Sequence, residues 1–366
     1  MKRHRRAKAR VAVGLSGGVD SSVALALLKD EGYDCVGLTF RMWPKEECGH
    51  SIGRACCNLE AITRARAVAE SLKVPYYVID LHKEFRAHVI DYFCREYLEG
   101  RTPNPCIVCN EKIKFGLLLD KARSFGARSV ATGHYAKVSF DKRRGRYLLR
   151  DGKDTTKSQS YFLFSLSQTQ LAHALFPLGA LTKEEVRAIA KKYRLKTFDA
   201  ASSQDVCFIR DADYAVYIKE KTGVRQSGGA IVDASGKVLG RHRGIASYTI
   251  GQRRGLGIAA KTPLYVTGID IGKNRVVVGE KKEVLKDSLV AHRLNWIAID
   301  PPKGPLDVTA MIRYNHPKVK ARITRLDADS VRVDFAKPQE APTPGQAVVF
   351  YDRDVVIGGG WIKQAY

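Results

Sequence analysis

The chain has 366 residues, of which 45% are hydrophobic and 27% charged, an ordinary globular composition with room for two or three domains. It carries 62 Lys and Arg against 38 Asp and Glu, a net charge of +24, and this excess favours a polyanionic partner such as nucleic acid. No apolar run approaches the roughly 18 residues of a membrane span, and the basic start MKRHRRAKAR leads into a strand pattern without a secretory signal, so we expect no membrane association and a cytoplasmic, reducing location for the eight cysteines.

Strand-like and helix-like segments alternate over the first 200 residues or so. Short apolar runs predict strands at 10–15, 35–40, 75–80 and 128–133, and periodic patterns predict helices at 21–31, 59–72, 83–98 and 111–125. Thr182 and Glu185 form a capping-box pattern for a further helix that runs to Tyr193. Such alternation indicates an α/β fold with a parallel sheet covered by helices.

Beyond about residue 225 the pattern becomes all-β, with short strands joined by Gly, Asn and Asp turns. A small β-rich module followed by a β-barrel fits this pattern, and the stretch DPPKGP at 300–305 is expected to be a loop. We therefore expect three domains: an α/β catalytic domain at 1–210, a central β-rich module at 211–284 and a C-terminal barrel at 285–366.

A glycine-rich turn, SGGVDSS at 16–22, lies between a predicted strand and a predicted helix. Glycines let the backbone approach a ligand closely, and the N–H groups of the helix start favour an anion, so the turn predicts a phosphate or pyrophosphate site. It is neither a Walker A loop nor a dinucleotide-binding G-x-G-x-x-G motif. The sequence ATGHYA at 131–136 ends a predicted strand at the sheet edge where ligands of such folds bind.

The eight cysteines divide into candidates for chemistry and candidates for the core. Cys106 and Cys109 form a C-x-x-C pair in TPNPCIVCN, and Cys207 lies in SSQDVCFI. From the spacing alone the pair remains a metal clip, a redox pair or a nucleophile with a helper, although the chain has no second C-x-x-C for a four-cysteine zinc site. Cys35 and Cys94 lie in apolar patterns and are expected in the core. The remaining three lie near His50 at a spacing that fits no common zinc pattern: Cys48, Cys56 and Cys57.

The SGGVDSS heptad resembles the PP-loop of the N-type ATP pyrophosphatases, which cleave ATP between its α and β phosphates. Seven further stretches, TPNPCIVCNEKIKFG, ATGHYAK, GKDTTKSQSYFLFSL, SSQDVCFI, YTIGQRRGLGI, RYNHPKVKARI and PTPGQAVVF, resemble blocks of the tRNA-specific 2-thiouridylase family, in the family's order and from about residue 11 to the end of the chain. This resemblance implies an enzyme that uses ATP and Mg²⁺ to thiolate the wobble uridine of tRNA. It also implies a persulfide donor protein, either a cysteine desulfurase or a relay carrier, and tRNAs of the Lys, Glu and Gln type.

The family's roles, carried over position by position, divide into catalysis, ATP binding and tRNA binding. Cys207 would carry the persulfide, and Cys109 would be the nucleophile that ends in a disulfide with it. ATP would be held by Gly14, Leu15, Ser16, Gly17, Gly18, Val19, Asp20, Ser21, Phe40 and Gly133, with Asp20 near the pyrophosphate and its Mg²⁺. The base and the tRNA would be contacted by Asn104, Pro105, Cys106, His134, Lys157, Ser158, Gln159, Arg313, Tyr314 and Gln346.

Two positions depart from the family pattern. Cys106 stands where many members have an aspartate proposed as a general base, and Ser158 stands where an aspartate is common. The first departure leaves a second chemistry open, because Cys106, Cys109 and Cys207 together are the ligand set of a [4Fe–4S] cluster with one open iron. The sequence therefore supports persulfide chemistry with a cluster mechanism as the alternative.

Two other classes of function compete with this interpretation. A PP-loop enzyme acting on a small acid would need neither the paired cysteines nor a basic β-barrel. A non-catalytic RNA-binding factor would have no use for an intact nucleotide loop together with all three cysteines. The paired cysteines, the basic β-barrel and the intact nucleotide loop therefore favour a tRNA sulfurtransferase over both alternatives.

Overall fold

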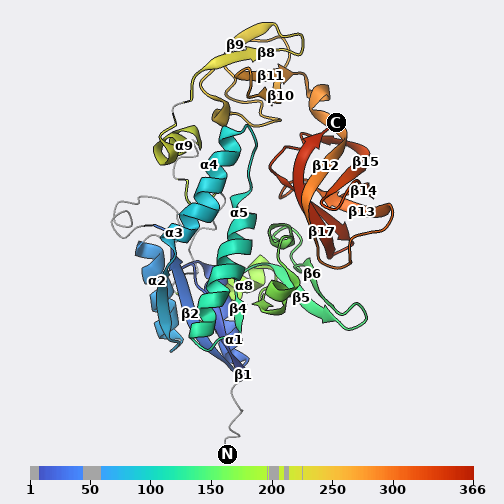
Figure 1. Cartoon of the computed structure of the whole chain (residues 1–366). Coiled ribbons are helices and arrows are strands. Elements are labelled where there is room, and N and C mark those ends of the chain that lie inside the picture. The colour runs from blue at the N-terminus through green and yellow to red at the C-terminus, as the bar shows by residue number, and fades with distance from the viewer. Residues whose placement is uncertain (1–7, 44–58, 196, 198–205, 210–213, 225) are drawn as a thin grey trace, which may run out of the picture. The chain divides into compact units, whose positions relative to one another are not determined.

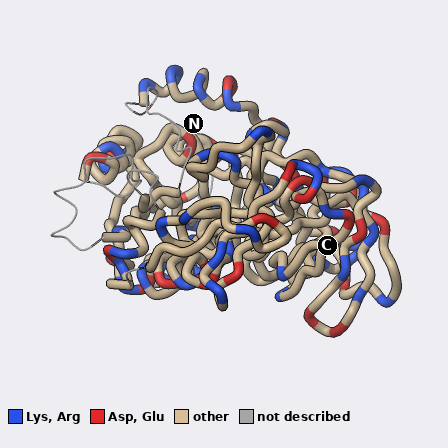
Figure 2. Tube along the Cα trace, turned by 90° about the horizontal axis from the view of Figure 1, so that it is seen from above, with Lys and Arg blue, Asp and Glu red and all other residues tan. Residues whose placement is uncertain are grey.

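The computed structural model describes residues 8–43, 59–195, 197, 206–209, 214–224 and 226–366. The chain divides into two compact units, of which the first contains 1–89, 106–210 and 354–356 and the second contains 90–105, 211–353 and 357–366. Lys and Arg are spread along the traced chain of both units, among fewer Asp and Glu (Figure 2).

The first unit is built on the predicted parallel sheet. Its strands are β1 (Lys8–Gly14), β2 (Tyr33–Arg41), β3 (Tyr76–Asp80), β4 (Ser129–Ala131) and β7 (Ala174–Leu175), in the order β3-β2-β1-β4-β7. All four neighbouring pairs are parallel. The chain leaves β1 toward β2 on one side and reaches β4 on the other, and ligands of such sheets bind at this reversal, beyond the carboxyl ends of the strands.

Helices cover this sheet as predicted. They include α1 (Val19–Asp30), α2 (Leu59–Ser71) and α8 (Lys183–Lys192), and α1 and α8 contact each other (Figure 1). The core between helices and sheet contains Val11, Val13, Val23, Val68 and Val186. The capping box is confirmed, since Thr182 Oγ1 accepts from the Glu185 N–H and the Glu185 carboxylate accepts from the Thr182 N–H.

Two predicted helices contain π-helical turns. The segment expected at 83–98 consists of α3 (His82–Phe85), the π turn η1 (Arg86–Ile90) and α4 (Asp91–Leu98). The segment expected at 111–125 begins earlier, as α5 (Pro105–Val108), and continues through the π stretch η2 (Cys109–Leu117) into α6 (Leu118–Ser124). Pro105 starts this helix because a proline needs no hydrogen-bond partner at the first helical position. The CIVC sequence is therefore helical.

A hairpin that the sequence patterns did not predict follows β4. Strands β5 (Ala136–Asp141) and β6 (Arg146–Asp151) pair antiparallel outside the parallel sheet, and β6 also pairs with Val355 through Arg150 (Figure 1). The 3-10 turn η3 (Ser160–Leu163) and helix α7 (Gln168–Ala172) come next. Polar and apolar residues alternate in β5 but not in β6, and the turn between the two strands consists of three basic residues and Gly145, so the sequence shows no clear hairpin pattern.

The second unit contains the central β-rich module. Helix α9 (Tyr214–Thr222) precedes a sheet in the order β10-β11-β8-β9, made of β8 (Gly229–Val232), β9 (Val238–His242), β10 (Tyr265–Asp270) and β11 (Arg275–Gly279), with the 3-10 turn η4 (Ile245–Ser247) between β9 and β10. Its core is formed by Ile231, Tyr248, Leu256, Val266, Val276 and Val278. The predicted β-rich texture of this region is confirmed.

The same unit contains the predicted barrel. After the 3-10 turn η5 (Lys281–Val284), six strands follow: β12 (Leu285–Trp296), β13 (Leu306–Met311), β14 (Val319–Arg325), β15 (Ser330–Glu340), β16 (Ala347–Asp352) and β17 (Val355–Ala365). They run in the order β12-β15-β14-β13-β16-β17, and pairing of β12 with β17 closes the barrel. Residues 300–305 form a loop, as expected.

Cys35 and Cys94 are buried, as predicted for core cysteines, and burial raises the pKa of the Cys35 thiol to about 11. The other three non-site cysteines, Cys48, Cys56 and Cys57, lie outside the described residues, as does His50. Within the described ranges, no helix has the length and apolarity to cross a membrane.

Candidate functional site

The glycine-rich turn connects β1 to α1 as predicted, at the edge of the sheet where the chain reverses. Leu15 extends the β1–β2 ladder by donating its N–H to Leu38 O at 2.8 Å. Inside the turn, Ser21 Oγ accepts from the Ser16 N–H at 3.2 Å and donates to Gly18 O at 3.1 Å. In the described part of the chain no side chain caps the first turn of α1, so the N–H groups of this turn are available to bind an anion.

Two glycines in this turn and its neighbour are required by close packing. Gly17 has φ +73°, and a Cβ there would lie 2.3 Å from Ala61 O. Gly133, just after β4, lies so close to the start of α1 that a Cβ would be 2.7 Å from the Asp20 carbonyl carbon. The structure therefore brings together the two segments that were predicted to bind nucleotide, 14–21 and 133. Phe40 lies in β2, the strand next to β1, near the carboxyl end of β2.

Asp20, the acidic residue of the turn, is held by two side chains that sequence reasoning missed. Lys183 Nζ lies 2.6 and 2.7 Å from its two carboxylate oxygens, and the Tyr135 hydroxyl donates to it at 2.8 Å. Lys183 is 7% exposed. Burial, followed by the charge of Asp20, raises the pKa of Tyr135, so its hydroxyl remains a donor. The Lys183 ammonium and the Asp20 carboxylate thus form an ion pair next to the glycine-rich turn.

His134 follows Gly133 and is buried, with Nδ1 2.6 Å from Thr132 Oγ1. Its ring packs near the rings of Phe115 and Phe176. Burial, and then the positive charge of Lys114, lowers the pKa of His134 well below its ordinary value. The imidazole is therefore neutral at physiological pH and offers hydrogen bonds without a charge.

The three candidate cysteines occupy different local structures of the first unit. Cys106 lies exposed on α5, and Cys109 is buried at the start of η2. Cys207 is half-buried, and its neighbour Phe208 packs on Phe85 with ring centroids 5.8 Å apart. Phe85 ends α3, a helix that contacts η2. The segments of Cys109 and Cys207 thus meet the same short helix.

The cluster alternative requires three cysteines arranged as ligands of one group. Among the residues that the structure describes, no set of three or more His, Cys, Asp or Glu side chains is placed to hold a metal ion. Cys106 is also exposed while Cys109 is buried. As arranged in the described residues, the three cysteines do not fit the ligand set of a [4Fe–4S] cluster.

The predicted tRNA-contact stretch 157–159 is tied to Tyr135. Gln159 Oε1 accepts from the Tyr135 N–H at 3.1 Å, and the Gln159 N–H donates to Tyr135 O at 2.9 Å. Ser158 Oγ donates to Asp151 at 2.7 Å, whereas Lys157 is exposed. Because Tyr135 also contacts Asp20, this stretch and the nucleotide loop share one supporting residue.

The predicted tRNA-contact residues of the barrel lie at two places in the second unit. Arg313 is exposed and Tyr314 half-buried, in the turn after β13. Gln346 instead holds a segment of its own unit, donating to Thr102 O at 3.0 Å and to Pro103 O at 3.1 Å. It thereby fixes the chain just before Asn104, which is buried, and Pro105.

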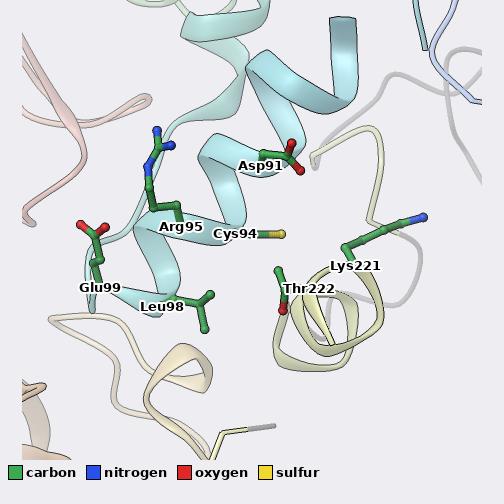
Figure 3. Close-up of a pocket in the computed structure, with 7 residues that line it drawn as sticks. All are labelled: Asp91, Cys94, Arg95, Leu98, Glu99, Lys221 and Thr222. Carbon is green, nitrogen blue, oxygen red and sulfur yellow. The ribbon is translucent and has the colours of Figure 1, made fainter. Parts of the chain in front are cut away.

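A pocket of about 420 Å³ lies apart from these residues, between α4 and α9 in the second unit. Its lining, shown in Figure 3, is Asp91, Cys94, Arg95, Leu98, Glu99, Lys221 and Thr222. No residue of the predicted site lines this pocket.

The strand–turn–helix at the sheet reversal, closed by Gly133 and carrying a fixed Asp20–Lys183 pair, defines the class of the protein: an α/β enzyme with a nucleotide-binding loop of the PP-loop type. Three family models cover it: a "tRNA methyl transferase HUP domain" at 9–211, a "tRNA methyl transferase PRC-barrel domain" at 216–280 and an "Aminomethyltransferase beta-barrel domain" at 286–362.

Curated relatives match over nearly the whole chain. The tRNA-specific 2-thiouridylase MnmA 2 of Thermoanaerobacter sp. (strain X514) is 49% identical over 97% of this chain and 98% of its own. MnmA of Geotalea uraniireducens is 49% identical over 97% of this chain and 95% of its own, and MnmA of Caldicellulosiruptor saccharolyticus is 46% identical over 98% and 99%. The chain belongs to the tRNA-specific 2-thiouridylase family, which confirms the resemblance found in the sequence.

Proposed function

We propose that this chain is an ATP-dependent tRNA sulfurtransferase that replaces the C2 oxygen of the wobble uridine, U34, with sulfur. The observation that carries the proposal is the glycine-rich turn at the sheet reversal, with Asp20 fixed by Lys183, in a chain 49% identical to named tRNA-specific 2-thiouridylases. Such a reaction requires a nucleotide to activate the C2 oxygen and two thiols to transfer sulfur. The nucleotide loop, Cys109 and Cys207 all belong to the first unit.

In the first step, the uridine C2 oxygen attacks the α-phosphorus of ATP, and the bond to pyrophosphate breaks. The N–H groups at the start of α1 and the Lys183 ammonium suit the phosphates that leave. Asp20 is the carboxylate that would hold Mg²⁺, in keeping with the usual binding of this ion by one or two carboxylates and the substrate phosphates. The remaining ATP contacts are proposed at Gly14–Ser21, Phe40 and Gly133.

In the second step, the outer sulfur of a Cys207 persulfide attacks C2, and AMP leaves with the former C2 oxygen. The Cys109 thiolate then attacks the Cys207 sulfur, which breaks the persulfide S–S bond and leaves sulfur on C2. The products are 2-thiouridine and a Cys109–Cys207 disulfide, and an external thiol must supply two electrons for the next turnover. Cys106, exposed at the usual aspartate position, is proposed as the base that takes the N3 proton of the uridine when its C2 oxygen is adenylated in the first step.

Contacts to the base are proposed for Asn104, Pro105 and the neutral His134. Further tRNA contacts are proposed at Lys157, Ser158, Gln159, Arg313, Tyr314 and Gln346. A flipped-out wobble base is the form in which such an enzyme reaches C2. The domains 1–210, 211–284 and 285–366 divide this work between catalysis and tRNA binding.

The proposed partners are those that the family resemblance implies. The substrates are tRNAs with a wobble uridine, of the Lys, Glu and Gln type, and the sulfur donor is a persulfide protein, either a cysteine desulfurase or a relay carrier. We place the reaction in the cytoplasm, without a membrane, because the thiols must be kept reduced.

The family models are described as methyltransferases, but methyl transfer needs neither an ATP-cleaving loop nor a second thiol. A test separates the functions: the purified protein is incubated with labelled pyrophosphate, ATP and either unmodified tRNA or a panel of small acids. We expect exchange of label into ATP only with tRNA, and 2-thiouridine once a persulfide donor is added. Exchange with a small acid alone would refute the proposal.

The iron content decides between the two sulfur routes. We expect protein purified without oxygen to be colourless, to contain less than about 0.1 iron per chain, and to thiolate tRNA with a persulfide donor. About four irons per chain, lost together with activity in Cys106→Ala, would establish the cluster route instead.

A further inference from the structure

The β5–β6 hairpin, residues 136–151, carries a concentration of positive charge that the nucleotide site does not use. Its 16 residues include six basic side chains and two acidic ones. The basic residues are Lys137, Lys142, Arg143, Arg144, Arg146 and Arg150. At the tip, Lys142, Arg143 and Arg144 are all exposed.

The backbone of this tip is held in one shape. Asp141 Oδ1 accepts from the N–H groups of Arg143 and Arg144 at 2.9 and 3.2 Å, and Gly145 closes the turn with φ +62°. The Arg144 side chain lies 3.8 Å from the Asp141 carboxylate. For Lys142 and Arg143, by contrast, the residues described here offer no ion-pair partner. The backbone that carries these two cations is therefore held in one shape, and no described residue neutralises their charge.

Two aromatic rings lie in the paired strands that flank this turn, Phe140 in β5 and Tyr147 in β6. Phe140 is 52% exposed and stands opposite Tyr147 in the strand register, with ring centroids 5.0 Å apart. Gln168 of α7 clamps the backbone of Tyr147, accepting from its N–H at 2.7 Å and donating to its carbonyl at 3.0 Å. The hairpin thus carries a pair of aromatic rings, one of them on a backbone held by α7, in addition to the two cations.

This combination distinguishes the hairpin from a merely solvated basic surface. A solvated basic surface requires charged side chains alone, whereas a platform for unpaired nucleotides combines backbone-directed cations with rings on which bases stack, and this hairpin carries both. A membrane surface would require a larger apolar face than one exposed ring provides. RNA is therefore the partner that the chemistry favours.

We infer that the β5–β6 hairpin is an RNA-binding element, in which Lys142 and Arg143 contact phosphates and Phe140 stacks on an unpaired base or ribose. This inference rests on the proposed function, since tRNA is then the RNA in question. The hairpin acts as a docking surface and takes no part in the reaction.

The test measures tRNA binding by the full chain over a range of salt concentrations. In a double variant Lys142→Ala, Arg143→Ala, we expect the slope of log affinity against log salt to become shallower by about one to two, and affinity at low salt to fall about fivefold or more. Pyrophosphate exchange at saturating tRNA should stay unchanged. The matched control, Lys121→Ala with Lys191→Ala, removes two exposed charges from α6 and α8 of the same unit and should keep the wild-type slope.

Phe140 tests the aromatic contribution separately. We expect Phe140→Leu to weaken tRNA binding about fivefold with an unchanged salt slope. Phe140→Trp, which keeps an aromatic ring, should bind tRNA with wild-type affinity. If the hairpin and control variants alter the slope equally, or if only binding to anionic phospholipid vesicles changes, the inference is wrong. A wild-type protein that binds and thiolates tRNA, while its hairpin variants behave normally, would overturn the inference alone; failure of the wild type to bind tRNA would overturn the proposed function as well.

Discussion

Cys109 and Cys207 are the residues on which the proposed chemistry depends, and neither belongs to the nucleotide loop. Cys109 is buried at the first residue of a π-helical stretch, a conformation often found at functional sites. Cys207 lies beside Phe208, which packs on Phe85. The nucleotide loop and the two cysteines therefore lie on separate elements. Substitution of a cysteine should abolish sulfur transfer without abolishing adenylation.

We expect Cys109→Ser and Cys207→Ser each to lower 2-thiouridine formation by at least about a thousandfold, because an alcohol neither carries a persulfide nor resolves one. Pyrophosphate exchange with tRNA should remain within about threefold of wild type. The measurement is mass spectrometry of nucleosides, and Cys35→Ser, at a buried core position, serves as the control. Thiolation by Cys207→Ser would contradict the persulfide route.

His134 gives a pH dependence of stability. Since its pKa is lowered on folding, the unfolded chain takes up a proton as the pH falls below about 6.5 while the folded chain does not. The contribution of His134 to the free energy of unfolding should therefore be complete above about pH 6.5. Below that pH the free energy of unfolding should decrease, by up to about 1.4 kcal/mol per pH unit for this one group.

Urea unfolding between pH 5 and 7 measures this effect. The variant His134→Gln should show a shallower decrease than wild type across the same range. An identical slope in both proteins would mean that His134 is not the group responsible. His292 and His316, whose pKa values are also lowered by burial, act in the same direction in the second unit and are unchanged in the variant.

At the scale of elements, the PP-loop is shaped by its packing as much as by its own residues. Gly17 adopts a positive φ while α2 lies against it, whereas Gly18 has an ordinary extended conformation with φ −95°. Arg64 of α2 also donates to Gly17 O at 3.2 Å. The loop thus depends on a helix some 40 residues later in the chain (Figure 1).

This arrangement predicts different outcomes for two neighbouring substitutions. Gly17→Ala should lower the free energy of unfolding by about 2 kcal/mol or more, because it adds a left-handed alanine and a backbone clash, and should weaken ATP binding. Gly18→Ala should cost about 1 kcal/mol or less, since a Cβ there is in near-ordinary contact with Ser16 Oγ. Denaturant unfolding and nucleotide binding measure both, and equal effects would show that the Ala61 contact does not constrain the loop.

At the scale of the whole molecule, the two units carry different parts of the proposed task. The nucleotide loop and the three candidate cysteines belong to the first unit, while the barrel with Arg313 belongs to the second. Substitutions in the barrel should therefore affect the affinity for tRNA and leave the affinity for ATP unchanged.

Arg313→Ala tests this division. We expect the KM for tRNA to rise about fivefold and the salt slope of tRNA binding to fall by about one, with the KM for ATP unchanged. Lys303→Ala, which removes another exposed cation of the same unit, is the control. A change in the KM for ATP without one for tRNA would place Arg313 outside the tRNA contacts.

The sequence by itself determined the α/β domain, the all-β second half, the nucleotide turn and the family, because hydrophobic periodicity, glycine spacing and motif order are local properties of the chain. The capping box at Thr182 was predictable for the same reason. The sequence pattern predicted a helix at 111–125, but the helix begins at Pro105. A proline is found both in loops and at the first helical position, so the residue alone did not indicate the start.

Only the tertiary structure decided which residues support the site. Lys183 and Tyr135 lie 163 and 115 positions from Asp20, and Gln346 lies 244 positions from Thr102. Sequence periodicity within a window of ten or twenty residues gives no information about such contacts, because they join segments that only the folded chain brings together. The aromatic pair of the β5–β6 hairpin could likewise not be predicted from the sequence, because only strand pairing places Phe140 opposite Tyr147.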